Sequence, residues 1–350
     1  DKLQCKDVYA VMNLDEQERM TSSSGGVFIK LAKYILKQNG VVFGAVFNEK
    51  YEVCHVAASS EEQLIPMLGS KYLQSRIGNT YKETLTYLKE NRLVLFTGSP
   101  CQIKGLYSFL RNKKYVNLIT MDFLCHGVPS PGVWKRYFEE NFVEERINPP
   151  LAEVGKNFVL KTSLNVNSPI GEVKFRDKFE SGWKKFRFVV RQKSAFKADK
   201  NIVLLSNIYY DNPYMKGFLS DLYLRPSCYE CRCKNGVSHS DITIGDYWGV
   251  KEVDKELDDD RGLSVVMLNT EKGQEFFSHL KGLRSKQIFL DNAKRLNGGF
   301  SEHTIPHPKR NLFFSLINKK MYRVDKAVEK CLKRTLIDKI FERLKMLGNK

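Results

Sequence analysis

The sequence lacks any apolar stretch near the ~20 residues that a membrane-spanning helix needs. Its first residues, DKLQCKDVYAV, contain no apolar signal-peptide core, and we find no internal repeat or low-complexity block. Eight cysteines in 350 residues are too few for a disulfide scaffold. With 42% hydrophobic and 12% aromatic residues, the chain has ample material for one large or two medium cores. We therefore expect a globular, cytoplasmic protein whose cysteines serve metal or redox chemistry.

Acidic residues are scarce relative to basic ones. The 57 Lys and Arg residues outnumber the 40 Asp and Glu residues, which gives a net charge of +17 and favours anionic partners. No recognition motif with the aromatic residues expected for base stacking is present, so we predict no nucleic-acid partner. Residues 306–350 hold thirteen basic and four acidic residues, with apolar residues at helical spacing between them. This tail is predicted to be a basic amphipathic helix or helix pair that packs on its own domain or contacts an anionic membrane or a partner.

The order of apolar segments predicts the fold class. A strand at 8–13, a polar loop, a helix and the apolar run VVFGAVF are followed by a helix at 82–89, the strand LVLFTG, a helix at 102–111 and the strand VNLITMDFL. Alternating helices and continuously apolar strands indicate an α/β protein with a mainly parallel sheet and flanking helices.

The pattern changes near residue 155. The segments FVLKTSLNV, GEVKFRDKF and KKFRFVVRQ alternate apolar and polar residues, as half-exposed antiparallel strands do. The helical stretch PYMKGFLSDLYL follows, and the strands SDITIGDYWG and GLSVVMLNT come after a cysteine-rich loop. We therefore predict an α/β part at 1–155, an inserted antiparallel β-rich subdomain with closing α/β elements at 156–305, and a helical tail at 306–350.

Four cysteines are placed where they can meet at one site. Cys228 and Cys231 form a C-x-x-C pair, a spacing that lets two thiolates reach one metal centre. Cys101 and Cys125 each follow a predicted parallel strand, and the carboxyl ends of such strands share one edge of the sheet. Ligands from three separated loops suit an iron-sulfur cluster better than a compact zinc knuckle. We predict a 4Fe-4S cluster at these four residues, with Cys233 as a fifth candidate that could replace a neighbour and buried core thiols as the alternative.

Two short polar loops have residue types suited to a phosphate or a flavin. Hydroxyls, a flexible backbone and a helix N-terminus suit a phosphate, although a serine-rich helix cap explains the first loop as well. A cation and an aromatic ring suit a flavin or nucleotide, although a turn with a solvated lysine explains the second. The residues of the first loop are Ser22, Ser23, Ser24, Gly25 and Gly26, and those of the second are Gly69, Ser70, Lys71 and Tyr72.

Further candidates have two interpretations each. His126 follows Cys125 and is a candidate proton relay or a polar residue with a structural partner. Arg176 and Asp177 in FRDKFESGW suit a substrate face, or a salt bridge at the end of a strand. Asp246 in IGDYWG orders the loop at the cluster, or only packs.

Taken together, SSSGGVF, GSKYLQS, FTGSPCQIKGL, FLCHGVPSPGVW, FRDKFESGW, RPSCYECRCK and SDITIGDYWG resemble, in the same order, the beta-subunit family of coenzyme F420-reducing hydrogenases and dehydrogenases. The likeness runs from about residue 8 to residue 285. It implies an oxidoreductase subunit with a 4Fe-4S cluster and a flavin, expected to be FAD rather than FMN. The cluster passes single electrons to the flavin, which exchanges hydride with a deazaflavin. The four cysteines fall on the family's cysteine motifs, and the two polar loops fall where the flavin is expected.

The resemblance also concerns partners. Members often carry a ferredoxin segment before the point where this sequence starts, so we expect a ferredoxin-like donor on a separate chain or segment, and an oligomer is possible. Relatives that occur alongside polysaccharide-synthesis enzymes have an undefined acceptor, so the small-molecule hydride acceptor or donor is coenzyme F420 or an analogous substrate. The alternative is a zinc-stabilised accessory or binding protein without redox function, linked to polysaccharide synthesis.

Overall fold

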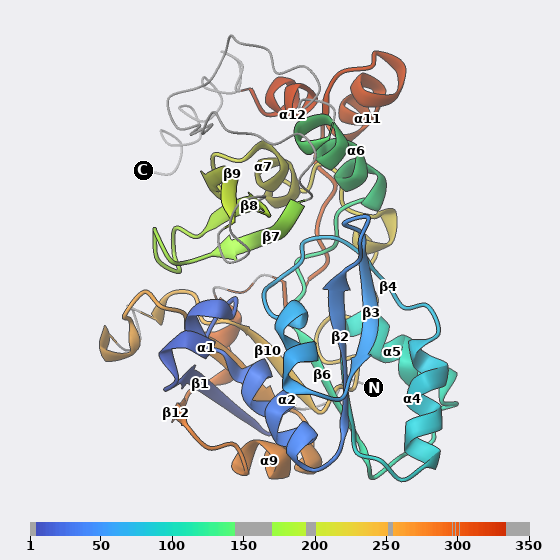
Figure 1. Cartoon of the computed structure of the whole chain (residues 1–350), viewed down its shortest axis with the longest axis vertical. Helices are drawn as coiled ribbons and strands as arrows, with labels where there is room; N and C mark the ends of the chain where they lie inside the picture. Colours follow the sequence, from blue (N-terminus) through green and yellow to red (C-terminus); the bar gives the residue numbers. More distant parts are fainter. Residues whose placement is uncertain are drawn as a thin grey trace, which may run out of the picture.

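The computed structural model of the chain contains two sheets with helices packed against them (Figure 1). The larger sheet has nine strands and the smaller has three. Within the described part of the chain, no helix is long and apolar enough to cross a membrane. The structure describes residues 5–143, 170–193, 201–250, 255–295, 297, 299–300 and 302–333.

The bounds of the strands and helices are as follows. The strands are β1 (Asp7–Asn13), β2 (Val41–Phe47), β3 (Val53–Ala58), β4 (Ser75–Arg76), β5 (Val94–Thr97), β6 (Leu118–Phe123), β7 (Ile170–Asp177), β8 (Arg187–Gln192), β9 (Ile202–Ile208), β10 (Ile242–Asp246), β11 (Ser264–Leu268) and β12 (Leu283–Gln287). The helices are α1 (Glu16–Thr21), α2 (Val27–Lys37), α3 (Glu61–Leu64), η1 (Ile65–Met67), α4 (Thr80–Lys89), α5 (Pro100–Phe109), α6 (Pro131–Phe142), α7 (Pro213–Leu219), η3 (Pro226–Cys228), η4 (Lys255–Leu257), α9 (Glu271–Ser278), α10 (Leu290–Arg295), α11 (Arg310–Lys319) and α12 (Val324–Leu332).

The large sheet has a parallel centre and antiparallel pairs on both sides. Its strand order is β12-β1-β11-β10-β6-β5-β2-β3-β4. β10, β6, β5 and β2 run parallel to one another, whereas β1 pairs antiparallel with β11 and β12, β10 with β11, and β2 with β3. The α/β prediction is therefore confirmed, in the form of a mixed sheet whose parallel strands lie mainly at its centre.

Helices cover both faces of this sheet because its central strands are apolar on both sides. In β2, Val42 and Val46 join the core under α2, whereas Val41 and Phe43 join the core under α4 and α5. Successive side chains of a strand point to opposite faces, so a strand buried on both faces is apolar throughout. The run VVFGAVF has this composition, and its glycine admits Met67 to within 2.7 Å of the position that a Cβ atom would occupy.

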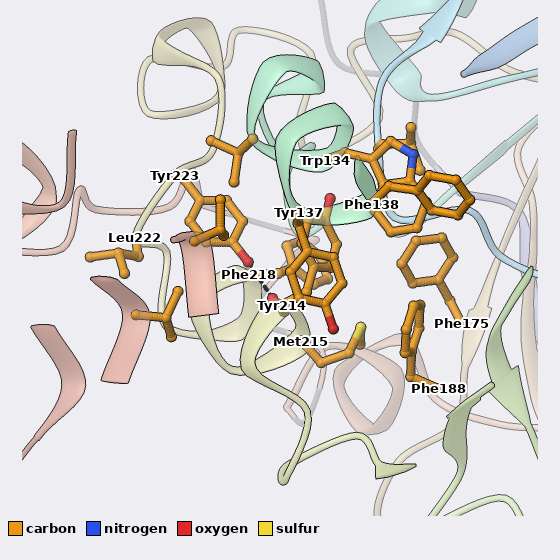
Figure 2. Packing of buried hydrophobic residues seen from close by; sticks show 14 of the residues in the cluster. Trp134, Tyr137, Phe138, Phe175, Phe188, Tyr214, Met215, Phe218, Leu222 and Tyr223 are labelled. Atoms are coloured by element: carbon orange, nitrogen blue, oxygen red, sulfur yellow. Dashed lines mark hydrogen bonds between the residues drawn. The ribbon is translucent and has the colours of Figure 1, made fainter. Parts of the chain in front are cut away.

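The small sheet and four helices form a second core beyond one edge of the large sheet (Figure 1). β7, β8 and β9 are antiparallel, and α6, α7, α11 and α12 pack beside them. Figure 2 shows Trp134 of α6 and Tyr214 of α7 among the aromatic residues of this core. Phe47, at the end of β2, lies 6.1 Å from Trp134 between ring centroids, which joins this core to the carboxyl edge of the large sheet.

Parts of the predicted organisation lie outside the described residues. The expected strand FVLKTSLNV occupies 158–166, and the last part of the basic tail occupies 334–350. Within the rest of the tail, α11 and α12 pack against α6 and α7. β10, β11 and β12 rejoin the large sheet after the insertion, and the division at residues 155 and 305 stays a prediction.

His55 on β3 joins three strands as a neutral side chain. Its Nδ1 lies 2.6 Å from the Ser75 hydroxyl and its Nε2 lies 2.9 Å from the Thr97 carbonyl oxygen. Burial lowers the pKa of His55 from 6.5 to about 4. The unfolded chain therefore binds a proton as the pH falls below 6.5, while the folded chain stays neutral until about 4, so stability is lost through this window.

We expect His55→Gln to reduce this acid sensitivity. The histidine accounts for a loss of roughly 3 kcal/mol in unfolding free energy between pH 6.5 and pH 4. Urea unfolding across this range measures the difference between wild type and variant. The same change at His279, an exposed histidine, is the control. An equal acid sensitivity of wild type and His55→Gln would contradict the expectation.

Candidate functional site

The parallel strands place Cys101 and Cys125 at one edge of the sheet. β5 pairs with β6 so that Thr97 lies opposite Met121, and both chains then leave the sheet on the same side. Cys101 lies in the first turn of α5, with its thiol 3.2 Å from the Ser99 hydroxyl, and Cys125 lies two residues beyond β6. The sheet thus brings the ends of these two strands together, as the sequence predicts.

Backbone pairing carries Cys228 to the same edge. The Arg225 amide donates to the Val128 carbonyl at 2.9 Å, and the Val128 amide donates to the Cys228 sulfur at 3.4 Å. Gly127 has a φ of +146°, and a Cβ atom there would lie 2.7 Å from Leu224 Cδ1. A glycine is therefore required for the loop after Cys125 to approach the cysteine-rich segment so closely.

The cysteine thiols lie within electrostatic range of one another. Burial raises the pKa of Cys125 to about 12, and the charges of Cys101, Cys228 and Cys231 add to this rise. Burial also raises the pKa of Cys228. A hydrogen bond from Cys233 lowers the pKa of Cys231 to about 6. Because thiolates this close repel one another, the site favours a bound cationic group that neutralises them.

Four cysteines are a donor set that either a zinc ion or an iron-sulfur cluster can use. Tetrahedral Zn²⁺ with bonds of ~2.3 Å needs sulfur atoms ~3.8 Å apart. Among the residues that the structure describes, no three His, Cys, Asp or Glu side chains form a group that could hold a metal ion. An iron-sulfur cluster is itself several atoms wide and separates its four thiolates further. Cys101, Cys125, Cys228 and Cys231 come from three segments around one edge, which suits the larger group.

The two polar loops also meet, although they are distant in sequence. The Ser70 amide and hydroxyl both donate to the Ser23 hydroxyl, at 2.6 and 2.8 Å. Gly25 is fixed against β1 and β11, since a Cβ atom there would lie 2.3 Å from the Val11 carbonyl oxygen. Gly26, with a φ of +82°, precedes α2 as its N-cap residue and has no side chain, so the first amides of this helix have no side-chain acceptor at their N-cap residue.

Lys71 and Tyr72 extend this second loop in different directions. The Lys71 amine donates to carbonyl oxygens of its own loop, including that of Leu68 at 3.1 Å, and burial lowers its pKa. Tyr72 packs against Phe175 and Phe218, and the charge of Arg176 acts on its hydroxyl. The loop is thus connected to the second core through Tyr72 rather than through Lys71.

Arg176 pairs with Asp246 and not with its neighbour Asp177. The guanidinium of Arg176 donates to Asp246 Oδ2, while Asp177 accepts from Arg191 at 2.7 Å. Trp183 also donates to Asp246, at 3.2 Å, and is only 1% exposed. FRDKFESGW and IGDYWG therefore form one buried junction between the two sheets.

His126 has a partner and lies beside the second core. Its Nε2 is 2.7 Å from Asp221 Oδ1, and its ring meets Phe218 edge-on at 5.3 Å. The Phe218 ring also lies 4.9 Å from the Tyr72 ring. One aromatic side chain thus separates the cysteine edge from the loop that contains Tyr72.

Sequence reasoning missed three buried ionisable residues. Lys178 is 1% exposed and donates to three carbonyl oxygens, including that of Ser24 at 3.0 Å; burial lowers its pKa to about 7. Asp122 is 2% exposed, and burial raises its pKa to about 6. It lines a small pocket together with Cys125, Cys233 and Lys234, and this lysine is also buried. Only the position of Lys234, directly after Cys233, offers a signal in the sequence.

The fold and the site define an α/β protein with a thiol-rich centre at the carboxyl edge of its large sheet. Residues 91–288 of the 350 match the family described as the C terminus of the beta subunit of coenzyme F420 hydrogenase/dehydrogenase. This match covers more than half of the sequence. The chain therefore belongs to the coenzyme F420 hydrogenase/dehydrogenase beta-subunit family, which consists of oxidoreductase subunits.

A solved structure has the same fold. A chain of the xenon-derivatised F420-reducing NiFe hydrogenase complex from Methanosarcina barkeri aligns with a TM-score of 0.50 and 16% identity. The alignment covers 93% of this chain and 92% of that chain. No curated protein matches the sequence.

Proposed function

We propose that the chain is the iron-sulfur flavoprotein subunit of an oxidoreductase. It passes electrons between a ferredoxin-like donor, a 4Fe-4S cluster and FAD, and exchanges hydride with coenzyme F420 or an analogous small molecule. The observation that carries the proposal is the convergence of Cys101, Cys125, Cys228 and Cys231 from three segments at the carboxyl edge of the parallel strands. The structural neighbour belongs to a hydrogenase complex, which supports a role beside partner subunits.

The protein's own contribution is to bind, orient and shield the cofactors. A cluster and a flavin supply one-electron and hydride transfer when bound. The four cysteines hold the cluster, and Cys101 keeps an exposed position that suits contact with an electron donor. The Ser22–Gly26 loop and the uncapped start of α2 offer amides and hydroxyls to a flavin phosphate, and Ser70 fixes the neighbouring Gly69–Tyr72 loop.

The relative position of the two candidate sites supports their coupling. Phe218 contacts His126 on the cysteine side and Tyr72 on the side of the polar loops. His126 follows Cys125 directly and is paired with Asp221, so it can hold a proton at Nε2 near the point where electrons arrive. We retain it as the proposed proton relay.

Hydrogen bonding between the polar loops gives a test of the flavin site. We expect Ser23→Ala to raise the Kd for FAD by up to roughly thirtyfold, because it removes the acceptor of two hydrogen bonds, each worth about 1 kcal/mol, that hold the loops together. Fluorescence titration of the flavin-free protein with FAD measures this change. Ser278→Ala is the matched control, since the Ser278 hydroxyl only donates to a carbonyl of its own helix at 2.7 Å.

A second assay tests the reaction with the loaded protein. Protein loaded with cluster and FAD is mixed with a reduced ferredoxin and coenzyme F420, and reduction of the coenzyme is followed by absorbance. Transfer that depends on the ferredoxin supports the proposed route. Equal FAD binding by wild type and Ser23→Ala would place the flavin away from these loops.

A further inference from the structure

Lys234 is a buried cation without a carboxylate partner among the described residues. The residue is only 8% exposed. Its amine donates to the carbonyl oxygens of Cys125 and Gly299, the latter at 2.8 Å. Burial of a charged ammonium group is unfavourable unless an opposite charge lies nearby. Two carbonyl dipoles satisfy its hydrogen bonds but leave its charge without a counter-charge.

Two kinds of group near Lys234 can carry a negative charge: the cysteines, and Asp122, whose carboxylate accepts hydrogen bonds from Ser238 and Thr243. The Lys234 amine donates to the carbonyl oxygen of Cys125, and Lys234 follows Cys231 by three residues. It also lines the pocket that contains Cys125 and Cys233. A cluster held by four thiolates would carry net negative charge beside this amine, so the lysine would offset part of that charge.

The contacts of Lys234 also fix the polypeptide around the cysteines. By binding the carbonyl oxygens of Cys125 and Gly299, its amine joins the loop after β6 to the segment that follows α10. A Cβ atom at Gly299 would lie 3.1 Å from the Cys125 carbonyl oxygen, so the two segments are in direct contact. The charge is therefore held in place by the backbone and cannot move away into solvent.

From this geometry we infer that Lys234 is a positioning residue that raises the reduction potential of the cluster. The inference rests on the proposed function. Reduction adds one negative charge to the cluster, so a fixed cation stabilises the reduced form more than the oxidised form. The effect is large when the cation is buried, because water screens it little, and net charge around the sulfurs is one of the factors that set cluster potentials.

The test compares variants of the full chain loaded anaerobically with iron and sulfide. Lys234→Gln removes the charge and keeps a polar side chain with an N–H donor, and Lys234→Arg keeps the charge. We expect Lys234→Gln to lower the equilibrium constant for one-electron reduction at least tenfold, which is ~59 mV in midpoint potential. Lys234→Arg is expected to shift it by less than half of that amount. Potentiometric titration followed by electron paramagnetic resonance measures the potential directly.

Lys104→Gln is the matched control. Lys104 lies on α5, and its charge acts on Cys233, but it is only partly buried and better screened, so we expect a smaller shift. Should Lys234→Gln fail to fold, Lys234→Met takes its place with the same expected shift. An unchanged potential, or loss of iron from every neutral variant that folds, would overturn the tuning role. A wild-type chain that binds no iron would instead refute the proposed function itself.

Discussion

A Cys228→Ala variant is expected to lose nearly all of its iron, from about four atoms per chain to fewer than one. The remaining three thiols cannot complete the ligand set. The cluster would also be open to solvent at the place where the Val128 amide donates to the Cys228 sulfur in the wild type. Iron and acid-labile sulfide assays after anaerobic reconstitution measure the loss. The loss of visible absorbance provides a second readout.

Two other cysteines serve as controls for this result. Cys54 on β3 is a partly buried thiol that packs against the core under α2, away from the cysteine edge, so Cys54→Ala should keep its iron. Cys233→Ala should keep it as well if Cys231 is the ligand, and would lose it if Cys233 replaces that neighbour. Full iron retention by Cys228→Ala would show that the cluster lies elsewhere or is not formed.

Asp246→Ala is expected to destabilise the protein by about 3–5 kcal/mol, because it leaves the charge of Arg176 buried without its partner. The side chains of Arg176 and Asp246 are 4% and 15% exposed. Asp246 also accepts a hydrogen bond from Trp183, so the change breaks two contacts of the junction between the sheets. Urea unfolding of the flavin-free protein measures the change in free energy.

A second variant separates the pair from its surroundings. Replacing both partners, as Arg176→Met with Asp246→Leu, should recover much of the lost stability, since no isolated charge remains. Glu52→Ala breaks the exposed pair between Glu52 and Arg76 and should cost less than about 1 kcal/mol. A cost for Asp246→Ala as small as that of Glu52→Ala would show that the junction does not depend on this ion pair.

The local elements were predictable where the composition of a segment and its position in the sequence indicate the same structure. The strands β5 and β6 are mostly apolar, although Thr120 and Asp122 lie on one face of β6, and each strand ends within four residues of a cysteine, so their shared edge follows from the rule for parallel strands. The C-x-x-C spacing of Cys228 and Cys231 is likewise visible in the sequence. The α/β class and the antiparallel insertion needed no further information.

Long-range pairing was not predictable. β1 lies between β11 and β12, which follow it by more than 250 residues, and nothing within DVYAVMN specifies these partners. β3 was missed because a histidine and a cysteine interrupt its apolar pattern, although His55 is buried through hydrogen bonds to neighbouring strands. The contact between Ser23 and Ser70 depends on this same folding of distant segments.

The burial and the partners of charged residues near the site were not predictable from the sequence either. Lysines are usually solvated, so no pattern marks Lys178 as buried, and the only signal for Lys234 is its position directly after Cys233. Each is held by carbonyl oxygens of loops that meet only in the folded chain. A salt bridge at the end of a strand was one of two interpretations of Arg176, the other being a substrate face; its partner Asp246 lies seventy residues away in sequence.

The most direct test of the account is the composition of the wild-type chain purified without oxygen. We predict about four irons, about four sulfides and one flavin per chain, with little zinc, together with a visible spectrum that changes on reduction. Stoichiometric zinc with neither iron nor flavin would contradict the account and would assign the cysteine edge to a structural metal site.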